Sequence, residues 1–183
     1  MSNLTVTPFE VLDFWWSAGP KKWFARDEAF DAQIRQRFAE TVDAAKAGSL
    51  SDWRDTPHGC LALIILLDQF TRNIFRNSPL AFEADGAAVD LATHALEYGF
   101  DKAYPTDARA FFYLPFEHAE DMDAQGRAVD LFRQLGNQDY YHYALIHMDV
   151  IRRFGRFPHR NEVLGRQTTA EEKAFLDDGG FSA

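Results

Sequence analysis

Three short segments of the sequence place charged or imidazole side chains next to apolar residues, and each could contribute to a binding or catalytic site. The first, residues 68–73, reads Asp-Gln-Phe-Thr-Arg-Asn. In a helix, Asp68 continues the apolar face of residues 61–65, and a buried carboxylate is costly unless it is paired. Arg72, one turn later, is the expected partner. The pair is either a structural ion pair or part of a pocket, in which Asp68, Arg72 and Asn73 are candidate ligand-binding residues.

The second segment, residues 111–121, reads Phe-Phe-Tyr-Leu-Pro-Phe-Glu-His-Ala-Glu-Asp. His118 has Asp121 three residues later, a spacing at which a carboxylate can fix the tautomer of an imidazole ring. His118 and Asp121 are therefore candidate catalytic residues for acid–base chemistry, although the same pattern suits metal binding or a histidine satisfied within the core. Glu117 and Glu120 are also three residues apart, a spacing typical of a solvated helix face. Glu120 is in addition a candidate ligand-binding residue.

The third segment, residues 152–166, is the one clear basic patch. It holds five arginines against the single acid Glu162, a local charge of +4. Because the whole chain carries a net charge of −9, the rest of the chain carries −13. Gly155 and Pro158 indicate an irregular loop, and loops on a rigid scaffold often carry function.

Side chains in this loop could bind a phosphate or a carboxylate through Arg156 and Arg160. Asn161 is the expected N-cap of a short turn, and a helix N-terminus adds backbone donors to such a site. In this hypothesis His159 is a candidate catalytic residue, and the other three are candidate ligand-binding residues. Alternatively, the arginines only neutralise internal acids such as Asp68.

Helix start and stop signals recur along the whole chain, and no strand-like alternation separates them. Thr7 and Glu10 form a capping box, and a second one follows at Thr169 and Glu172. The expected helices run from Pro8 to Trp16, from Asp27 to Gly48, from Thr56 to about Phe75, from Asp85 to Gly99, from Thr106 through Phe116, from about Asp123 to Leu135, from about Gln138 to Phe154, and from Thr169 to Leu176. Short loops favour antiparallel neighbours, so the predicted fold is all-α, an irregular bundle or array of antiparallel α-hairpins.

The composition fits one packed domain. Of the 183 residues, 46% are hydrophobic and 15% are aromatic, which excludes a disordered chain. We therefore expect a single domain over residues 1–183, with a frayed tail from about residue 178. The net charge of −9 argues against binding to nucleic acid or to a membrane surface. No signal peptide or membrane-spanning run is found, so a cytoplasmic location is expected.

Sequence motifs for common cofactors and metals are missing. There is no glycine-rich phosphate loop, dinucleotide fingerprint or Gly-x-Ser-x-Gly elbow, so no cofactor is implied. His142 and His147 are five residues apart and lie on different helix faces, and nothing in the spacing of other residues indicates a metal site. The single cysteine, Cys60, lies beside an apolar run and is expected to be buried and inert.

Several of these strings resemble the bacterial proteins of the domain of unknown function family 924, and the resemblance covers nearly the whole chain. The residues that carry it are Val11–Trp15, Trp23–Phe24, Asp68–Phe70 with Arg72–Asn73, Tyr113–Pro115 with His118 and Glu120, and Arg153–Asn161. The last string, Arg-Phe-Gly-Arg-Phe-Pro-His-Arg-Asn, is the most specific. The resemblance implies a tetratricopeptide-like helical fold and brings no established activity.

Two positions depart from the pattern of this family. The family usually has proline where this chain has Thr71, and serine where this chain has Ala119. The proline would favour a break before Arg72, so such a break is less expected here. The alanine removes a hydroxyl beside His118, which disfavours any mechanism that requires that hydroxyl as a nucleophile.

The sequence is compatible with three functions. In the first, acids, imidazoles and arginines from the three segments line one pocket for a small anionic molecule, which the protein binds or converts. In the second, the helical array offers a groove to a protein or peptide partner, as fold analogy suggests. In the third, the polar residues form ion-pair networks that only hold the helices together. The sequence specifies neither a reaction nor an oligomeric state.

Overall fold

The computed structural model describes residues 6–182, and within them the chain is helical, with no strand. This confirms the predicted all-α fold class. Residues 1–5, where a signal peptide would begin, and residue 183 of the predicted tail lie outside the described residues. The α-helices are α1 (Pro8–Ala18), α2 (Pro20–Trp23), α3 (Glu28–Lys46), α4 (Pro57–Ile64), α5 (Thr71–Ile74), α6 (Asp85–Glu97), α7 (Thr106–His118), α8 (Met122–Leu135), α9 (Gln138–Phe154) and α10 (Ala170–Asp177).

Shorter helical turns connect these elements. Four are 3-10 helices, η1 (Ser51–Asp55), η3 (Pro79–Ala81), η4 (Phe100–Ala103) and η5 (Pro158–Arg160). The fifth, η2 (Ile65–Phe70), is a π-helical turn between α4 and α5. In the part of the chain that the structure describes, no helix combines the length and the apolar character needed to cross a bilayer.

Local signals account for where most helices begin. The side chains of Thr7 and Glu10 cap α1 reciprocally, and the capping box expected at the start of α10 is also present. The expected cap of α7 is wrong, because its N-cap is Pro105 and Thr106 is already helical. Helix α8 begins at Met122, within one residue of the expected start and directly after its N-cap Asp121.

Residues 57–74 form the helix that the sequence predicts for this region, but its middle is not α-helical. The π-helical turn η2 carries Asp68 and Gln69, and both side chains are buried. Thr71 follows without a break, and its hydroxyl donates a hydrogen bond to the carbonyl oxygen of Leu67 at 2.8 Å. Single π-helical turns within α-helices are frequent at functional sites.

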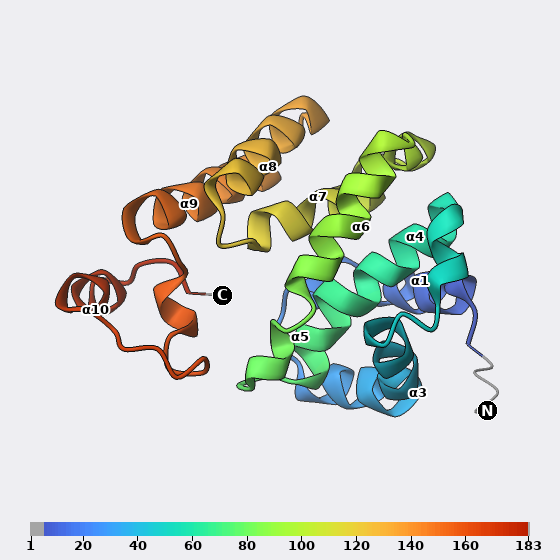
Figure 1. Ribbon diagram of the computed structural model, residues 1–183, viewed down its shortest axis with the longest axis horizontal. Helices are drawn as coiled ribbons and strands as arrows, with labels where there is room; N and C mark the ends of the chain where they lie inside the picture. The colour runs from blue at the N-terminus through green and yellow to red at the C-terminus, as the bar shows by residue number, and fades with distance from the viewer. Residues whose placement is uncertain (1–5, 183) are drawn as a thin grey trace.

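From α6 to α9 consecutive helices pack side by side, whereas the N-terminal helices pack on helices further along the chain (Figure 1). Helix α1 packs on α4, α3 on α5 and η2, α6 on both α4 and α7, α7 on α8, and α8 on α9. Helix α10 and the loop before it lie beyond the end of α9, away from the N-terminal helices. This arrangement fits a series of helical neighbours, and its tetratricopeptide-like character stays a prediction.

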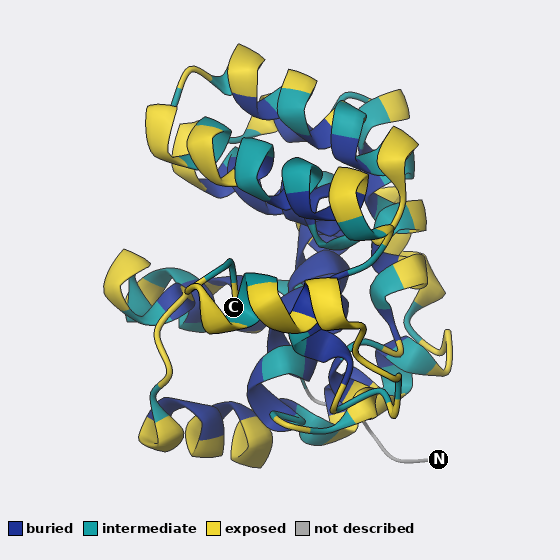
Figure 2. Ribbon diagram, turned by 90° about the vertical axis from the view of Figure 1, so that its left-hand side faces the viewer, coloured by how far each residue is buried: buried dark blue, intermediate teal, exposed yellow. Residues whose placement is uncertain are grey.

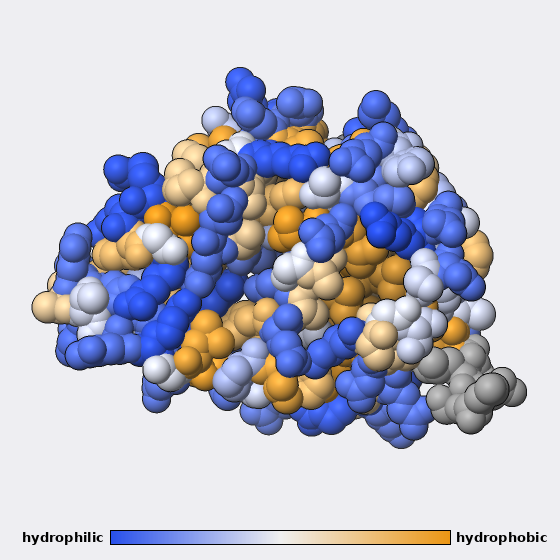
Figure 3. All heavy atoms as spheres, viewed as in Figure 1, coloured by the Kyte–Doolittle hydropathy of each residue, from blue (hydrophilic) through white to orange (hydrophobic). Residues whose placement is uncertain are grey.

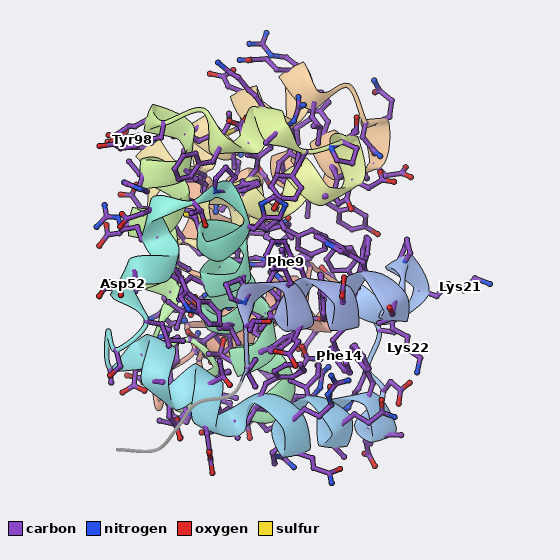
Figure 4. The ribbon with its side chains drawn as sticks, turned by 90° about the vertical axis from the view of Figure 1, so that its right-hand side faces the viewer. Phe9, Phe14, Lys21, Lys22, Asp52 and Tyr98 are labelled. Carbon is purple, nitrogen blue, oxygen red and sulfur yellow. The ribbon has the colours of Figure 1, made fainter. Side chains whose placement is uncertain are left out.

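Most buried side chains belong to one large hydrophobic cluster, whose members lie on the inward faces of the helices (Figure 2). Its centre is aromatic. Trp15 stacks on Trp23 with ring centroids 6.1 Å apart and meets Phe70 edge-on at 5.6 Å. Phe14 points from α1 toward α3, where its ring stacks on that of Phe30 at 5.5 Å (Figure 4). These contacts fix the N-terminal helices against η2.

A second, smaller cluster holds the C-terminal segment. Val150 and Ile151 of α9 are buried together with Phe157, and Phe175 of α10 packs against them. Phe181 lies in the tail that the sequence predicts to fray, yet its ring centroid is 6.4 Å from that of Phe157. The described part of the tail is therefore packed on the protein at this residue.

Candidate functional site

A cavity of about 530 Å³ opens where η3 and the start of α6, the end of α7, and the loop that begins with η5 meet. Its volume is typical of small-molecule sites. In the space-filling view, a hollow lies between the C-terminal segment and the start of α6, with apolar side chains along its edge (Figure 3). The polar lining residues are Glu83, Asp85, His118, Glu120, Asp121 and Arg160, and the apolar ones include Leu80, Phe82, Val89 and Leu164.

His118, the last residue of α7, lines the cavity at the point where the chain turns into α8. Helix α7 ends at His118 because Ala119 adopts an extended backbone, with ψ of 138°. The side chain of Gln125 stabilises this turn by donating hydrogen bonds to the carbonyl oxygens of Glu117 and Ala119, at 2.6 and 2.8 Å. The ring of His118 is therefore held at the end of a helix, on the cavity wall.

The expected pairing of His118 with Asp121 is wrong. That pairing requires one helix through residues 118–121, but the break at Ala119 removes the helical spacing. Asp121 is instead the N-cap of α8 and accepts a hydrogen bond from the backbone N–H of Ala124 at 2.8 Å. Asp121 still lines the cavity, but it does not orient the imidazole ring.

The partner of His118 is Asp68, which lies 50 residues earlier in the chain. Nδ1 of His118 lies 2.7 Å from Oδ1 of Asp68, so the carboxylate favours the tautomer in which Nδ1 carries the proton. Nε2 is then the ring nitrogen left for a ligand. Gln69 donates a hydrogen bond to Oδ2 of Asp68 at 2.5 Å, and the Asp68 side chain is only 1% exposed. The buried carboxylate thus orients the imidazole ring, as in catalytic histidine–aspartate pairs.

Arg72 extends this pair toward Asp85 and Arg160. Nη1 of Arg72 lies 3.3 Å from Oδ1 of Asp68, which is the ion pair that the sequence predicts. The same guanidinium donates two hydrogen bonds to Asp85, at 2.9 and 3.0 Å. Nη1 of Arg160 lies 3.3 Å from that carboxylate. An unbroken series of polar contacts therefore joins His118 to Arg160.

The charges in this series control the protonation of its members. Burial alone would raise the pKa of Asp68, but the charges of His118 and Arg72 outweigh it and hold the pKa below its usual range. Burial would likewise lower the pKa of Arg72, but the charges of Asp68 and Asp85 raise it. At neutral pH the aspartate is thus an anion and Arg72 a cation.

Arg160 is the member of the series whose charge is least compensated. Burial and the charge of Arg72 lower its pKa to about 10, although Asp85, which the two arginines share, acts in the opposite direction. Its guanidinium lies 4.5 Å from the ring centroids of both Phe82 and Phe157. Nε of Arg160 is buried and has no hydrogen-bond partner among the described residues. Because an unpaired buried donor is costly, the site favours an additional acceptor beside Arg160.

A second buried polar pair, Glu117 and His147, lies behind His118. The expectation that Glu117 faces solvent is wrong, since its side chain lies in the core at 4% exposure. Burial and the charge of Asp68 raise the pKa of Glu117 to about 8, whereas burial and the charge of His118 lower the pKa of His147 to about 3. Nδ1 of His147 lies 3.3 Å from Oε1 of Glu117. Since both groups are neutral at pH 7, this contact is not an ion pair.

The arginines of the loop after α9 pair with acids on other elements, and Arg160 is the one that lines the cavity. Arg156 makes two hydrogen bonds to Glu172 of α10, at 2.6 and 2.9 Å. Arg166 makes two to Glu120, also at 2.6 and 2.9 Å. Glu120 lines the cavity, but its charge is neutralised by Arg166. Arg156 is paired away from the cavity, which argues against the ligand-binding role predicted for this arginine.

The other candidate residues lie outside the cavity lining. Asn73 donates a hydrogen bond to Asp31 at 2.8 Å, and Asn161 donates one to Glu172 at 3.2 Å. The ring of His159 packs against the C-terminal tail, and burial lowers its pKa to about 4. These positions fit structural roles better than the predicted ligand-binding and catalytic ones. Within residues 6–182, no group of three or more His, Cys, Asp or Glu side chains is arranged to hold a metal ion.

The chain resembles known bacterial proteins over nearly its whole length. Residues 11–180 match a family model described as a bacterial protein of unknown function, DUF924. The chain belongs to this family. A solved structure of a protein of unknown function from Agrobacterium tumefaciens is 46% identical to this DUF924 protein, covers 94% of this chain and 97% of that chain, and superposes with a TM-score of 0.91. No curated protein matched the chain.

Ala119 gives this DUF924 protein a cavity wall without a hydroxyl beside His118. It lines the cavity at the position where the family pattern described above usually has serine. Among the described residues that line the cavity, none is a serine, threonine or cysteine. Beside Ala119, the lining therefore offers the imidazole of His118 and the carboxylates of Glu120 and Asp121 as its polar groups.

Proposed function

We propose that this DUF924 protein binds a small molecule through an anionic group, a phosphate or a carboxylate, in the cavity beside His118 and Arg160. The observation that carries the proposal is that a buried, incompletely paired guanidinium and an oriented imidazole line the same cavity. A guanidinium presents several donors in the geometry that phosphate and carboxylate oxygens accept. Nε2 of His118 supplies a further polar atom.

The charge balance of the surrounding side chains supports an anionic group. In the contact series from His118 to Arg160, two carboxylates face two guanidiniums and one imidazole. Glu120, the next acid along the wall, is neutralised by Arg166. An anion beside Arg160 therefore meets a contact series whose net charge is zero or positive, and its attraction is strengthened by the buried, low-dielectric environment of that arginine.

The same geometry supports acid–base chemistry on the bound molecule. Asp68 holds the ring of His118 through Nδ1, which leaves Nε2 for the ligand. Nε2 can therefore accept a proton from the ligand or from a water molecule and return it later in the reaction. We assign His118 as the acid–base residue, Asp68 as its positioning residue, and Arg160 as the anchor of the anionic group.

Thermal-shift titration with phosphate monoesters and short carboxylates tests the proposal. These anions should stabilise the wild type, and Arg160→Gln should bind them at least about tenfold more weakly, as expected for the loss of a charge-assisted contact. Arg156→Gln is the matched control, because it removes a loop arginine that does not line the cavity. If no anion stabilises the wild type, or if both variants bind anions as tightly as it does, the polar series is only a structural network.

A further inference from the structure

The carboxylates that line the cavity differ in how they are paired. Asp85 is held by two arginines, and Glu120 and Glu83 each form an ion pair with one basic side chain, at 2.6 and 2.5 Å. Asp121 is the exception, since no basic side chain within residues 6–182 lies at ion-pair distance from it. Apart from the N-terminus of α8, which it caps, this carboxylate of the cavity wall has no positive partner among the described residues.

The second oxygen of Asp121 is available to a ligand. Oδ1 accepts the capping hydrogen bond from the backbone N–H of Ala124, at 2.8 Å. Oδ2 has no hydrogen-bond partner among the described residues, and the residue is exposed. A carboxylate oxygen of this kind is a good acceptor for an ammonium group.

The opposite charge in the same lining belongs to Arg160. Its side chain is 7% exposed, and within residues 6–182 its buried Nε has no hydrogen-bond partner. Most of the remaining lining is apolar and includes Leu80, Phe82, Val89 and Leu164. The cavity thus combines an incompletely paired cation, a carboxylate without a basic side-chain partner and an apolar surface. A ligand complementary to it carries an anionic group, a cationic group and an apolar part.

We propose that the ligand is a zwitterion with an apolar body. Its anionic group binds Arg160 and His118, and its ammonium group binds Asp121. Amino acids with the ammonium group at the far end of an apolar chain, and aminoalkyl phosphates, have this chemistry. The inference rests on the anion site proposed above and adds a second anchor to it. An unpaired carboxylate in the wall repels a second anionic group, so it also selects against dicarboxylates and other ligands with two separated negative charges.

Three five-carbon acids of matched length test this inference by calorimetric titration. Pentanoate carries one anionic group, glutarate has a second carboxylate at the far end, and 5-aminopentanoate has an ammonium group there. The wild type should bind 5-aminopentanoate about two- to fivefold more tightly than pentanoate, as expected for a partly exposed ion pair, and glutarate most weakly. A parallel comparison of butyl phosphate with 4-aminobutyl phosphate distinguishes a phosphate from a carboxylate as the anionic group.

Asp121→Asn is the variant that isolates the second anchor, because asparagine caps a helix as well as aspartate does and removes only the charge. It should bind pentanoate as the wild type does and lose the preference for the ammonium group. Arg160→Gln should weaken the binding of every compound.

The outcomes separate the two proposals. If the wild type binds pentanoate at least as tightly as 5-aminopentanoate, or if Asp121→Asn keeps the preference, the zwitterion inference is wrong while the anion site stands. If no compound binds, or if Arg160→Gln binds all of them like the wild type, the anion site itself is wrong and the inference falls with it.

Discussion

Replacing Glu117 with glutamine should stabilise the protein increasingly as the pH rises. Burial and the charge of Asp68 raise the pKa of Glu117 from its ordinary value of 4.5 to about 8. Between these pH values the unfolded chain has lost the proton while the folded protein keeps it, so the wild type loses stability as the pH rises. Glutamine does not ionise, and the variant avoids this loss.

The size of the effect follows from the difference between the two pKa values. A rise from 4.5 to about 8 corresponds to about 5 kcal/mol once the carboxyl is ionised in both states, at about 1.4 kcal/mol per pH unit. Near pH 5 the same difference contributes less than about 1 kcal/mol. The free energy of unfolding of Glu117→Gln, minus that of the wild type, should therefore grow by about 3–4 kcal/mol between about pH 5 and about pH 8.

Urea unfolding of both proteins at several pH values across this interval measures the difference. A changed contact with His147 would shift all the values equally and would not hide the trend. Glu162→Gln removes an exposed carboxyl from the basic loop and serves as the control, with no trend expected. If the difference in the free energy of unfolding between Glu117→Gln and the wild type stays constant with pH, Glu117 is not a buried neutral acid in the folded protein.

Two further substitutions test the packing around the site. Asp68→Asn leaves Arg72 without one of its acidic partners and should lower the free energy of unfolding by about 3–5 kcal/mol in urea, and unchanged stability would contradict the buried pairing. Gly59→Ala would push its Cβ into the carbonyl group of Trp53 and should cost about 1–3 kcal/mol. Gly126→Ala is the control, because the added Cβ meets open space on α8. An equal loss of stability in the two variants would argue against the close contact of residue 59 with the Trp53 carbonyl.

Signals within one helical turn predict the structure well. The capping boxes at Thr7 and Thr169 both form, because each involves residues only three positions apart. The ion pair of Asp68 with Arg72 is equally local and is present. Where a local pattern crosses a helix boundary, as at Asp121, the prediction is wrong, because the backbone break that ends α7 is stabilised by a side chain of the next helix.

The rest of the site depends on contacts that no local spacing specifies. His118 meets Asp68 across 50 residues, and Arg160 meets Asp85 across 75. The three arginines that follow α9, Arg156, Arg160 and Arg166, have many acids available in an acidic chain, and the packed helices decide which pairs form. Glu117 shows the same limit, because its position in the core is set by the helices packed around α7 and not by its neighbours in sequence.

The ring ¹⁵N NMR signals of the histidines, followed during titration with butyl phosphate or pentanoate, test most directly whether an anion binds beside His118 and Arg160. We predict that Nε2 of His118 shifts, while Nδ1, held by Asp68, changes little and the rings of His94 and His142, which do not line the cavity, stay unchanged. In Arg160→Gln the shift of Nε2 should disappear. A His118 signal that does not move, or equal shifts of all these rings, would contradict the proposed site.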